Sequence, residues 1–220
     1  MSAGAAIDGG VRLAWADPAE FDRARALHLL DGPERARAAD TADPAARDRF
    51  LLGRMLLRDL AARLGAVRPE EVVVVARCER CGGDHGRPRV HWPDASGSPP
   101  SVSLASCSAL VIAALAPSGI AVGVDVERPR AARSREAETD RRAAVVQLLG
   151  GSRRTAIRRW VRAEAVLKAD GRGLRVEPAS VVFGRDRAHV PDRPARYRLT
   201  DLRIDGCLVS VALARPPVRL

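Results

Sequence analysis

Apolar residues recur every three to four positions in two long stretches of the chain, which is the spacing of one face of an α-helix. In residues 44–64 the repeating positions are Gly53, Leu56, Leu57, Leu60, Ala61 and Leu64. In the second stretch they are Ile157, Trp160, Val161, Glu164, Leu167 and Lys168. We therefore predict two amphipathic helices, with Gly65 and Gly171 as their stops. A third helix is predicted over residues 137–149.

Strands are indicated where β-branched residues cluster or where apolar and polar residues alternate. The predicted strands are residues 11–15, 72–75, 110–115, 120–127, 181–183, 197–204 and 207–213. We expect residues 110–115 and 120–127 to form a hairpin through a turn at 117–119. A second hairpin is expected around Asp205-Gly206, because this pair favours the two-residue turn between antiparallel strands. Residues 78–100, rich in glycine and proline, are expected to form a loop.

Each half of the chain thus contains a helix, a short strand and a two-stranded hairpin, in that order. This order predicts an α+β fold of two similar units, residues 1–118 and 119–220, although no residue-level repeat relates them. The length of 220 residues allows one large domain or two small ones, so the length alone does not decide.

Two charged residues, Glu164 and Lys168, fall within the otherwise apolar stripe of the last predicted helix. A carboxylate and an ammonium in such a stripe need a partner, because burying either one unpaired is costly. Lys168 is also the only lysine among 37 lysine and arginine residues. A compact, titratable ammonium suggests a function that a guanidinium cannot perform. The alternative is that one lysine remained in a chain whose composition drifted towards arginine.

Two further carboxylates, Asp125 and Glu127, are two residues apart on one predicted strand. Because side chains alternate between the faces of a strand, both point to the same side. Like charges this close repel each other, which favours a cation between them or a shared proton. The alternative is a strand end at which both carboxylates are solvated.

The composition excludes some classes of protein. Hydrophobic residues make up 46% of the chain, which indicates a globular protein. No apolar run approaches the roughly 18 residues that span a bilayer, and the first residues lack the pattern of a signal peptide. Four cysteines are too few for a disulfide scaffold of this length. We therefore expect a cytoplasmic protein without membrane association.

The net charge of +10 favours polyanionic partners, such as nucleic acid, anionic lipid, phosphorylated cofactors or an acidic protein. Aromatic residues make up only 3% of the chain and offer few surfaces on which single-stranded nucleic acid could stack. The arginines are also scattered rather than gathered in one arm. We therefore expect no nucleic-acid partner.

Cys78 and Cys81 form a C-x-x-C pair, with His85 and His91 close behind. Two cysteines and two histidines can build a tetrahedral zinc site. The histidine spacing is loose, however, and the separation between cysteine and histidine is far shorter than in a zinc finger. The pair therefore indicates either a zinc site or, as the preferred interpretation, reduced cysteines in a surface loop.

Three segments follow one another in the second half of the chain: GVDVE at residues 123–127, WVRAEAVLK at 160–168 and GRGL at 171–174. They resemble the motifs of the 4′-phosphopantetheinyl transferase superfamily, of the surfactin-synthetase-activating type. That family carries G-[IV]-D-[IV]-E, then W-x-x-K-E-A-x-x-K followed by G-x-G-L. The segment CGGDHGRP at 81–88 is similar to a loop that many members have upstream. The resemblance extends from about residue 33 to residue 174.

The resemblance implies a fold of two similar α+β subdomains related by a pseudo-twofold axis. It also implies the transfer of 4′-phosphopantetheine from coenzyme A to a serine of an apo acyl or peptidyl carrier protein, with release of adenosine 3′,5′-bisphosphate. The reaction would depend on Mg²⁺, and the protein would act as a monomer. Carrier proteins of this class are acidic, so the net charge of +10 would attract them. The residues do not indicate whether the carrier serves fatty-acid, polyketide or nonribosomal peptide synthesis.

By their position in the motifs, Asp125, Glu127 and Glu164 would hold Mg²⁺ against the diphosphate of coenzyme A. Oxygen ligands of this kind suit the ion. The resemblance also implies that Glu164 helps to deprotonate the attacking serine, directly or through water. Lys168 would neutralise or protonate the leaving phosphate. The catalytic residues implied are thus Asp125, Glu164 and Lys168.

The residues that the resemblance places against coenzyme A are Arg47, Arg54, Arg87, Pro88, Ser106 and Lys168. Ser106 departs from the family, which has a histidine here, and this loss is expected to weaken coenzyme A binding unless an arginine compensates. Ala163 and Val161 also differ from the family, which has lysine and serine or threonine at these positions. The departures leave open a second function, that of a non-catalytic relative that binds coenzyme A or carrier proteins.

Overall fold

The computed structural model describes residues 3–7, 9–93, 98–130 and 134–214. Its contacts divide the chain into two compact units, Met1–Gly119 and Ile120–Leu220, one residue from the boundary expected from the sequence. Both units combine helices with antiparallel sheets, so the fold class is α+β. None of the helices in the described residues has the length and apolar character that a membrane span requires.

The first unit is built on a four-stranded antiparallel sheet with the strand order β1-β2-β6-β5. Its strands are β1 (Ala3–Ile7), β2 (Val11–Ala16), β5 (Ser101–Ser106) and β6 (Val111–Ala116). Every residue of β6 is buried, because this apolar strand has a neighbour on each edge and a helix against one face. The strand predicted over residues 11–15 is confirmed by β2.

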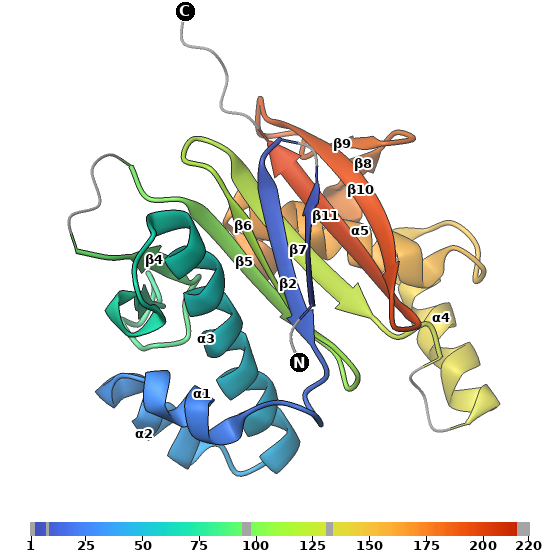
Figure 1. Ribbon diagram of the computed structural model, residues 1–220. Helices are drawn as coiled ribbons and strands as arrows, with labels where there is room; N and C mark the ends of the chain where they lie inside the picture. Colours follow the sequence, from blue (N-terminus) through green and yellow to red (C-terminus); the bar gives the residue numbers. More distant parts are fainter. Residues whose placement is uncertain (1–2, 8, 94–97, 131–133, 215–220) are drawn as a thin grey trace, which may run out of the picture. The chain divides into compact units, whose positions relative to one another are not determined.

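The longest helix, α3 (Pro44–Gly65), packs against β6, β2 and β5 of this sheet (Figure 1). Asp43 accepts hydrogen bonds from two amides of the first turn, and Pro44 suits a position where no donor is needed. The helix predicted over residues 44–64 is confirmed. It runs through Gly65, and Ala66 adopts the left-handed conformation, with φ of 53°, in which it ends.

Shorter elements complete the first unit. Two helices, α1 (Arg23–Leu29) and α2 (Gly32–Asp40), precede α3, and a 3₁₀ helix (Pro69–Glu71) follows it. A separate small sheet pairs β3 (Val73–Val75) with β4 (Arg89–His91). The strand predicted at 72–75 is thus confirmed, whereas the loop expected over 78–100 contains β4. Three residues are too few to show the alternation that identifies a strand.

The second unit is built on a five-stranded antiparallel sheet with the order β7-β11-β10-β9-β8. Its strands are β7 (Ala121–Glu127), β8 (Val182–Phe183), β9 (Arg187–His189), β10 (Arg196–Ile204) and β11 (Cys207–Ala214). Its helices are α4 (Arg135–Leu149), α5 (Ala156–Asp170) and two 3₁₀ helices, Gly173–Arg175 and Pro178–Ser180. The predicted hairpin is confirmed, since Asp205 and Gly206 both have the positive φ, 48° and 76°, that a tight two-residue turn requires.

The hairpin expected between residues 110–115 and 120–127 is wrong. β6 pairs with β2 and β5, whereas β7 pairs with β11. Alternation along the chain predicted both strands but not their partners, which lie far away in the sequence. The hairpin of the first unit is β5–β6, so the order of helix, short strands and hairpin still occurs in both units.

The two sheets share a local arrangement of three strands. In the first unit the order β2-β6-β5 places an early strand beside the second strand of a hairpin. In the second unit the order β7-β11-β10 does the same, with α5 against β7 and β11. In each unit, therefore, an early strand pairs with the second strand of a hairpin, and one long helix packs against these strands.

Candidate functional site

Gly123 allows the backbone of α5 to lie directly against strand β7. A Cβ atom at this position would overlap with the carbonyl oxygen of Ala165 and the amide nitrogen of Ala169. Both are backbone atoms of α5, which cannot give way as a flexible side chain would, so a larger residue does not fit. Because side chains two residues apart share a strand face, Asp125 and Glu127 point towards the same side of β7 as this contact.

Lys168 of α5 reaches the carboxylate of Asp125. Its Nζ lies 2.6 Å from Asp125 Oδ1 and donates a second hydrogen bond to the carbonyl oxygen of Val124, at 3.2 Å. Asp125 is 8% exposed. Burial raises the pKa of this carboxyl, although the charge of Lys168 acts in the opposite direction. The chain's only lysine is therefore the counter-ion of a buried carboxylate.

Glu127 is held by two residues of neighbouring helices. Arg141 of α4 donates a hydrogen bond to Glu127 Oε2 at 2.8 Å, and the side chain of Trp160 hydrogen-bonds to the same carboxyl group. Burial raises the pKa of Glu127, the charge of Arg141 lowers it, and the nearby charge of Asp125 raises it. Arg141 is a shared partner, since it also donates to Glu138 at 3.2 Å. Its part in the site was not predicted from the sequence.

Glu164 of α5 completes the group of acids, and one of its oxygens lacks a donor. Oε1 is buried and has no hydrogen-bond partner among the described residues. Burial raises the pKa of Glu164, the charge of Lys168 lowers it, and the charges of Asp125 and Glu127 raise it. Leaving a buried acceptor unsatisfied is costly. The site thus keeps an oxygen that a bound ligand could satisfy.

These residues offer the type of ligand that a divalent cation takes, although one oxygen from each of the three carboxylates does not lie within 4.8 Å of the other two in the described structure. The carboxylates of Asp125, Glu127 and Glu164, which we call the acid cluster, face two cations, Lys168 and Arg141. One of the two, Arg141, is shared with another acid, so negative charge is in excess. All available donors are carboxylate oxygens, the set that Mg²⁺ takes in preference to softer ligands.

The polar residues of α5 lie at the margin of its buried face, which corrects the stripe expected from the sequence. Ile157 and Leu167 are buried as predicted, whereas Trp160, Glu164 and Lys168 are partly exposed. The buried face of α5 turns instead towards its small residues, which permit the close approach to β7. Solvent and a ligand can therefore reach the charged groups.

A second group of predicted residues lies in the first unit, around a cavity of about 380 Å³ that we call the basic cavity. Three arginines line it: Arg37 of α2, and Arg49 and Arg54 of α3. Pro88 and Ser106, two of the residues expected at coenzyme A, are also in its lining. Such a cavity can receive an anion, because guanidinium groups bind phosphate through paired hydrogen bonds.

Two of the expected phosphate contacts do not line this cavity. Arg47 and Arg87 are both exposed and lie outside the lining. Helix α3 lines the cavity through Ala46, Arg49, Phe50, Gly53 and Arg54, and the exposed Arg47 in its first turns is not among these residues. Arg37 was not predicted because nothing in the sequence connects α2 with this cavity.

Arg54 is fixed by a buried ion pair. Its Nε lies 3.1 Å from Glu34 Oε1, and Arg58 approaches the other oxygen of Glu34 at 2.7 Å. The Arg54 guanidinium also packs 5.1 Å from the centre of the Phe50 ring. Burial lowers the pKa of Arg54, yet an arginine stays protonated in proteins. One carboxylate therefore faces two guanidinium groups, which leaves positive charge at the cavity wall.

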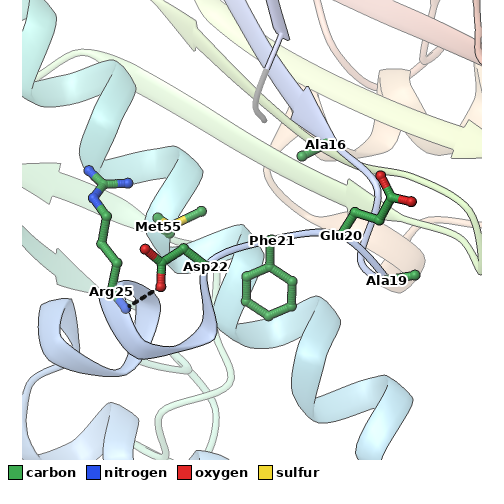
Figure 2. Close-up of a pocket in the computed structure, with 7 residues that line it drawn as sticks. All are labelled: Ala16, Ala19, Glu20, Phe21, Asp22, Arg25 and Met55. Carbon is green, nitrogen blue, oxygen red and sulfur yellow. Dashed lines mark hydrogen bonds between the residues drawn. The ribbon is translucent and has the colours of Figure 1, made fainter.

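Another cavity in the first unit, of about 450 Å³, is not a candidate site (Figure 2). It is lined by Ala16, Ala19, Glu20, Phe21, Asp22, Arg25 and Met55. Its polar groups serve the fold: Asp22 accepts a hydrogen bond from the amide of Arg25 at 2.9 Å and so caps α1. The side chain of Arg25 is paired with Asp59. None of the site residues predicted from the sequence lines this cavity.

No protein-family model matches this chain, and no curated protein sequence matches it. The family resemblance in the motifs therefore stays a prediction. What the chain does is inferred from the chemistry of the acid cluster and the basic cavity.

Proposed function

We propose that this chain is a phosphopantetheinyl transferase, which moves the 4′-phosphopantetheine group of coenzyme A onto a serine of an apo acyl or peptidyl carrier protein. The observation that carries the proposal is the acid cluster on β7 and α5. It combines three carboxylates, a buried Glu164 oxygen to which no described residue donates a hydrogen bond, and the only lysine of the chain. These residues occupy the positions at which the sequence resembles the transferase motifs.

The acid cluster would hold Mg²⁺ through Asp125, Glu127 and Glu164. The bound ion would offset the negative charge that develops on the departing adenosine bisphosphate as the P–O bond within the diphosphate breaks. Arg141 and Trp160 support this role, because hydrogen bonds from such outer residues fix the orientation of a ligating carboxylate. The unpartnered oxygen of Glu164 supports it as well, since a cation would satisfy it.

Two residues of α5 would move protons. The serine oxygen of the carrier bonds to phosphorus while the bond to the departing adenosine bisphosphate breaks. Glu164 would accept the serine proton, directly or through water, and its raised pKa makes it a stronger base than an exposed glutamate. Lys168 would neutralise or protonate the departing phosphate. Its side chain is 28% exposed, so it can turn from Asp125 towards a ligand.

The basic cavity would bind phosphate groups of coenzyme A. Arg37, Arg49 and Arg54 supply its charge, and planar guanidinium groups match the geometry of phosphate. Ser106 in the lining cannot supply the charge of the histidine that the family has there. These three arginines are the groups available to compensate. Arg87, exposed beside Pro88, would add a contact from outside the lining.

The shared strand arrangement supports the finer prediction for the fold, two similar subdomains related by a pseudo-twofold axis. Within each unit, an early strand joins the second strand of a hairpin, and a long helix packs on that strand. The net charge of +10 supports an acidic carrier protein as the partner. A monomer in the cytoplasm stays a prediction from the sequence.

The proposed roles can be tested by following the release of adenosine 3′,5′-bisphosphate by chromatography, with coenzyme A, Mg²⁺ and an apo carrier protein. Glu164→Gln and Lys168→Ala are each expected to lower the rate by about 100-fold or more, the contribution of a positioned acid or base. Glu136→Gln, at the exposed start of α4, is the matched control and should retain the rate.

Lys168→Arg separates two functions of the lysine, since it keeps the charge but cannot release a proton at neutral pH. Unchanged rates in both the Glu164→Gln and Lys168→Ala variants would refute the roles assigned to these residues. If the wild type binds coenzyme A but releases no product, the alternative of a non-catalytic relative would be favoured. That alternative is suggested by Ser106, which stands where the family has a histidine.

A further inference from the structure

The loop between β3 and β4 brings together three side chains that can ligate a metal. One ligand atom each of Cys78, Cys81 and His85 lies within 4.8 Å of the other two. Cys81 Sγ and His85 Nε2 are 2.9 Å apart. The fourth residue suggested by the sequence, His91, lies on β4 and is not part of this group. The loop belongs to the first unit and contains no residue of the acid cluster.

The backbone of this loop holds a tight turn around the three side chains. The carbonyl of Cys78 accepts a hydrogen bond from the amide of Gly82 at 2.9 Å, and the Cys78 amide donates to the carbonyl of Gly83 at 2.7 Å. Gly82 has a φ of 72°, which favours glycine. A Cβ atom on Gly83 would lie 3.2 Å from the His85 ring and 3.4 Å from Cys81 Sγ. This glycine therefore leaves the space in which the two side chains meet.

A tetrahedral zinc ion fits these ligands after a small movement of side chains. Zinc–sulfur bonds of about 2.3 Å and zinc–nitrogen bonds of about 2.0–2.1 Å place ligand atoms about 3.5–3.8 Å apart. The 2.9 Å contact between Cys81 and His85 would have to open by less than about 1 Å, and the other two pairs of ligand atoms are already no more than 4.8 Å apart.

The types of ligand favour zinc over the Mg²⁺ that we propose for the acid cluster. Thiolate and imidazole are ligands of zinc, whereas Mg²⁺ takes oxygen donors. All four cysteines lie in the described residues and none forms a disulfide, so both sulfurs of the pair can bind a metal as thiolates. Cys81 and His85 are exposed, so an ion can enter from solvent.

We propose that Cys78, Cys81 and His85 bind one Zn²⁺, with water in the fourth position. The same loop continues into Gly86 and Pro88, which line the basic cavity together with His85. Bound zinc would therefore fix the wall of that cavity. The site does not depend on the proposed transferase activity.

The loop is already tied to the rest of the first unit. Arg37 of α2 donates a hydrogen bond to the carbonyl oxygen of Asp84 at 2.6 Å, and the amide of Gly86 donates to the carbonyl of Ala76 at 2.5 Å. Because these bonds hold both sides of the turn, metal binding would not have to order the backbone. This arrangement lowers the entropy lost on binding and favours a stable site.

The test is the zinc content of the full-length protein, purified without a chelator or a histidine tag and measured by elemental analysis. We expect about one zinc ion for each chain of the wild type. Cys78→Ser and Cys81→Ser are expected to weaken zinc binding by at least about 100-fold, more than the loss of an outer-shell partner does. Cys107→Ser removes a thiol outside the cluster and is the matched control, which should retain the zinc.

Cobalt provides a readout that does not depend on whether a variant folds. Titration of the metal-free wild type with Co²⁺ should produce the thiolate charge-transfer band and the strong visible bands of a tetrahedral site. A wild type that lacks zinc and shows no such bands with Co²⁺ would overturn the proposal. Equal loss of zinc in Cys107→Ser would overturn it too, as would a disulfide between Cys78 and Cys81 in the protein purified under reducing conditions.

Discussion

Replacing Glu164 by glutamine tests whether the acid cluster is arranged to receive a cation. The substitution preserves the size of the side chain and removes one negative charge. Burial, together with the charges of Asp125 and Glu127, raises the pKa of Glu164, so the ionised form is less favourable in the folded chain than in the unfolded chain. Without metal, the variant is therefore expected to be more stable than the wild type at neutral pH.

The size of this effect follows from the charge that is removed, because glutamine keeps a polar atom at the position of the buried oxygen. A like charge at about 4 Å costs about 1 kcal/mol in bulk water and about 4 kcal/mol near a protein surface. Because Glu164 is partly exposed, solvent screens part of this cost, and we expect a gain of about 1–2 kcal/mol in the free energy of unfolding. For a chain of 220 residues, each kcal/mol raises Tm by about 2–4 °C. The expected increase in Tm is thus about 2–8 °C.

Mg²⁺ should reverse the order of stability. A ligand at 100 times its Kd stabilises a folded protein by about 2.7 kcal/mol, so saturating Mg²⁺ should raise the Tm of the wild type by about 5–11 °C. The Glu164→Gln variant has lost one ligand and should gain much less. Calorimetric or fluorescence melting with a chelator and with Mg²⁺ measures both quantities.

Asp201→Asn is the matched control, a second half-buried carboxylate of the same unit. Burial would raise the pKa of Asp201, but hydrogen bonds from Arg162, Ser210 and Arg158 hold it below its ordinary value. This variant should therefore lose stability by the same amount with and without Mg²⁺. A Glu164→Gln variant that melts below the wild type without metal would refute the reasoning. So would one that gains as much from Mg²⁺ as the wild type, because the ion would then bind elsewhere.

Further predictions concern pH, packing and the buried arginines. Since burial raises the pKa of all three acids of the cluster, the folded chain keeps their protons to a higher pH than the unfolded chain. Metal-free stability should fall, and Mg²⁺ affinity rise, as the pH increases through these raised values, and equal calorimetric affinities at about pH 5 and about pH 8 would argue against this. Gly123→Ala should cost about 3 kcal/mol in denaturant unfolding because it overlaps the backbone of α5, whereas Gly184→Ala, which meets only ordinary contacts, should change stability by less than about 1 kcal/mol. Glu34→Gln leaves Arg54 and Arg58 buried without a carboxylate and should cost about 3–5 kcal/mol, so a loss below about 1 kcal/mol would contradict the ion pair described.

Elements that depend on neighbours in the sequence could be predicted. The span of α3 follows from its apolar repeat, with Asp43 as its cap, and the turn between β10 and β11 follows from Asp205-Gly206. In such cases the residues that decide the structure lie within a few positions of each other. The end of α5 at Gly171, which has a φ of 88°, belongs to the same class.

Strand partners could not be predicted in this way. β6 and β7 are separated by only a few residues, yet one pairs with β2 and β5 and the other with β11. A buried apolar strand can pair on either edge with any strand of matching pattern, so alternation contains no information about the partner. The β6–β7 hairpin was expected because the two strands are close in the sequence, and closeness in the sequence does not determine which strands pair.

The candidate site shows the same division. Asp125 and Lys168 were expected to act together, and they form an ion pair of 2.6 Å in the structure. Arg141, which donates a hydrogen bond to Glu127, could not be recognised as a site residue from the sequence, because arginine is abundant in this chain. Gly123 was noted only as part of a motif, and its reason, the close approach of α5, requires the tertiary structure. Arg49 could have been found, since it lies one helical turn from Gly53 on the face of α3 that lines the basic cavity.

The intact mass of apo carrier proteins, incubated with this protein, coenzyme A and Mg²⁺, tests the proposed activity most directly. We predict that at least one carrier gains the mass of a single phosphopantetheine group, and that a chelator prevents the gain. No gain on any member of a panel of fatty-acid, polyketide and nonribosomal peptide carriers, with folded protein and saturating coenzyme A, would contradict the proposal.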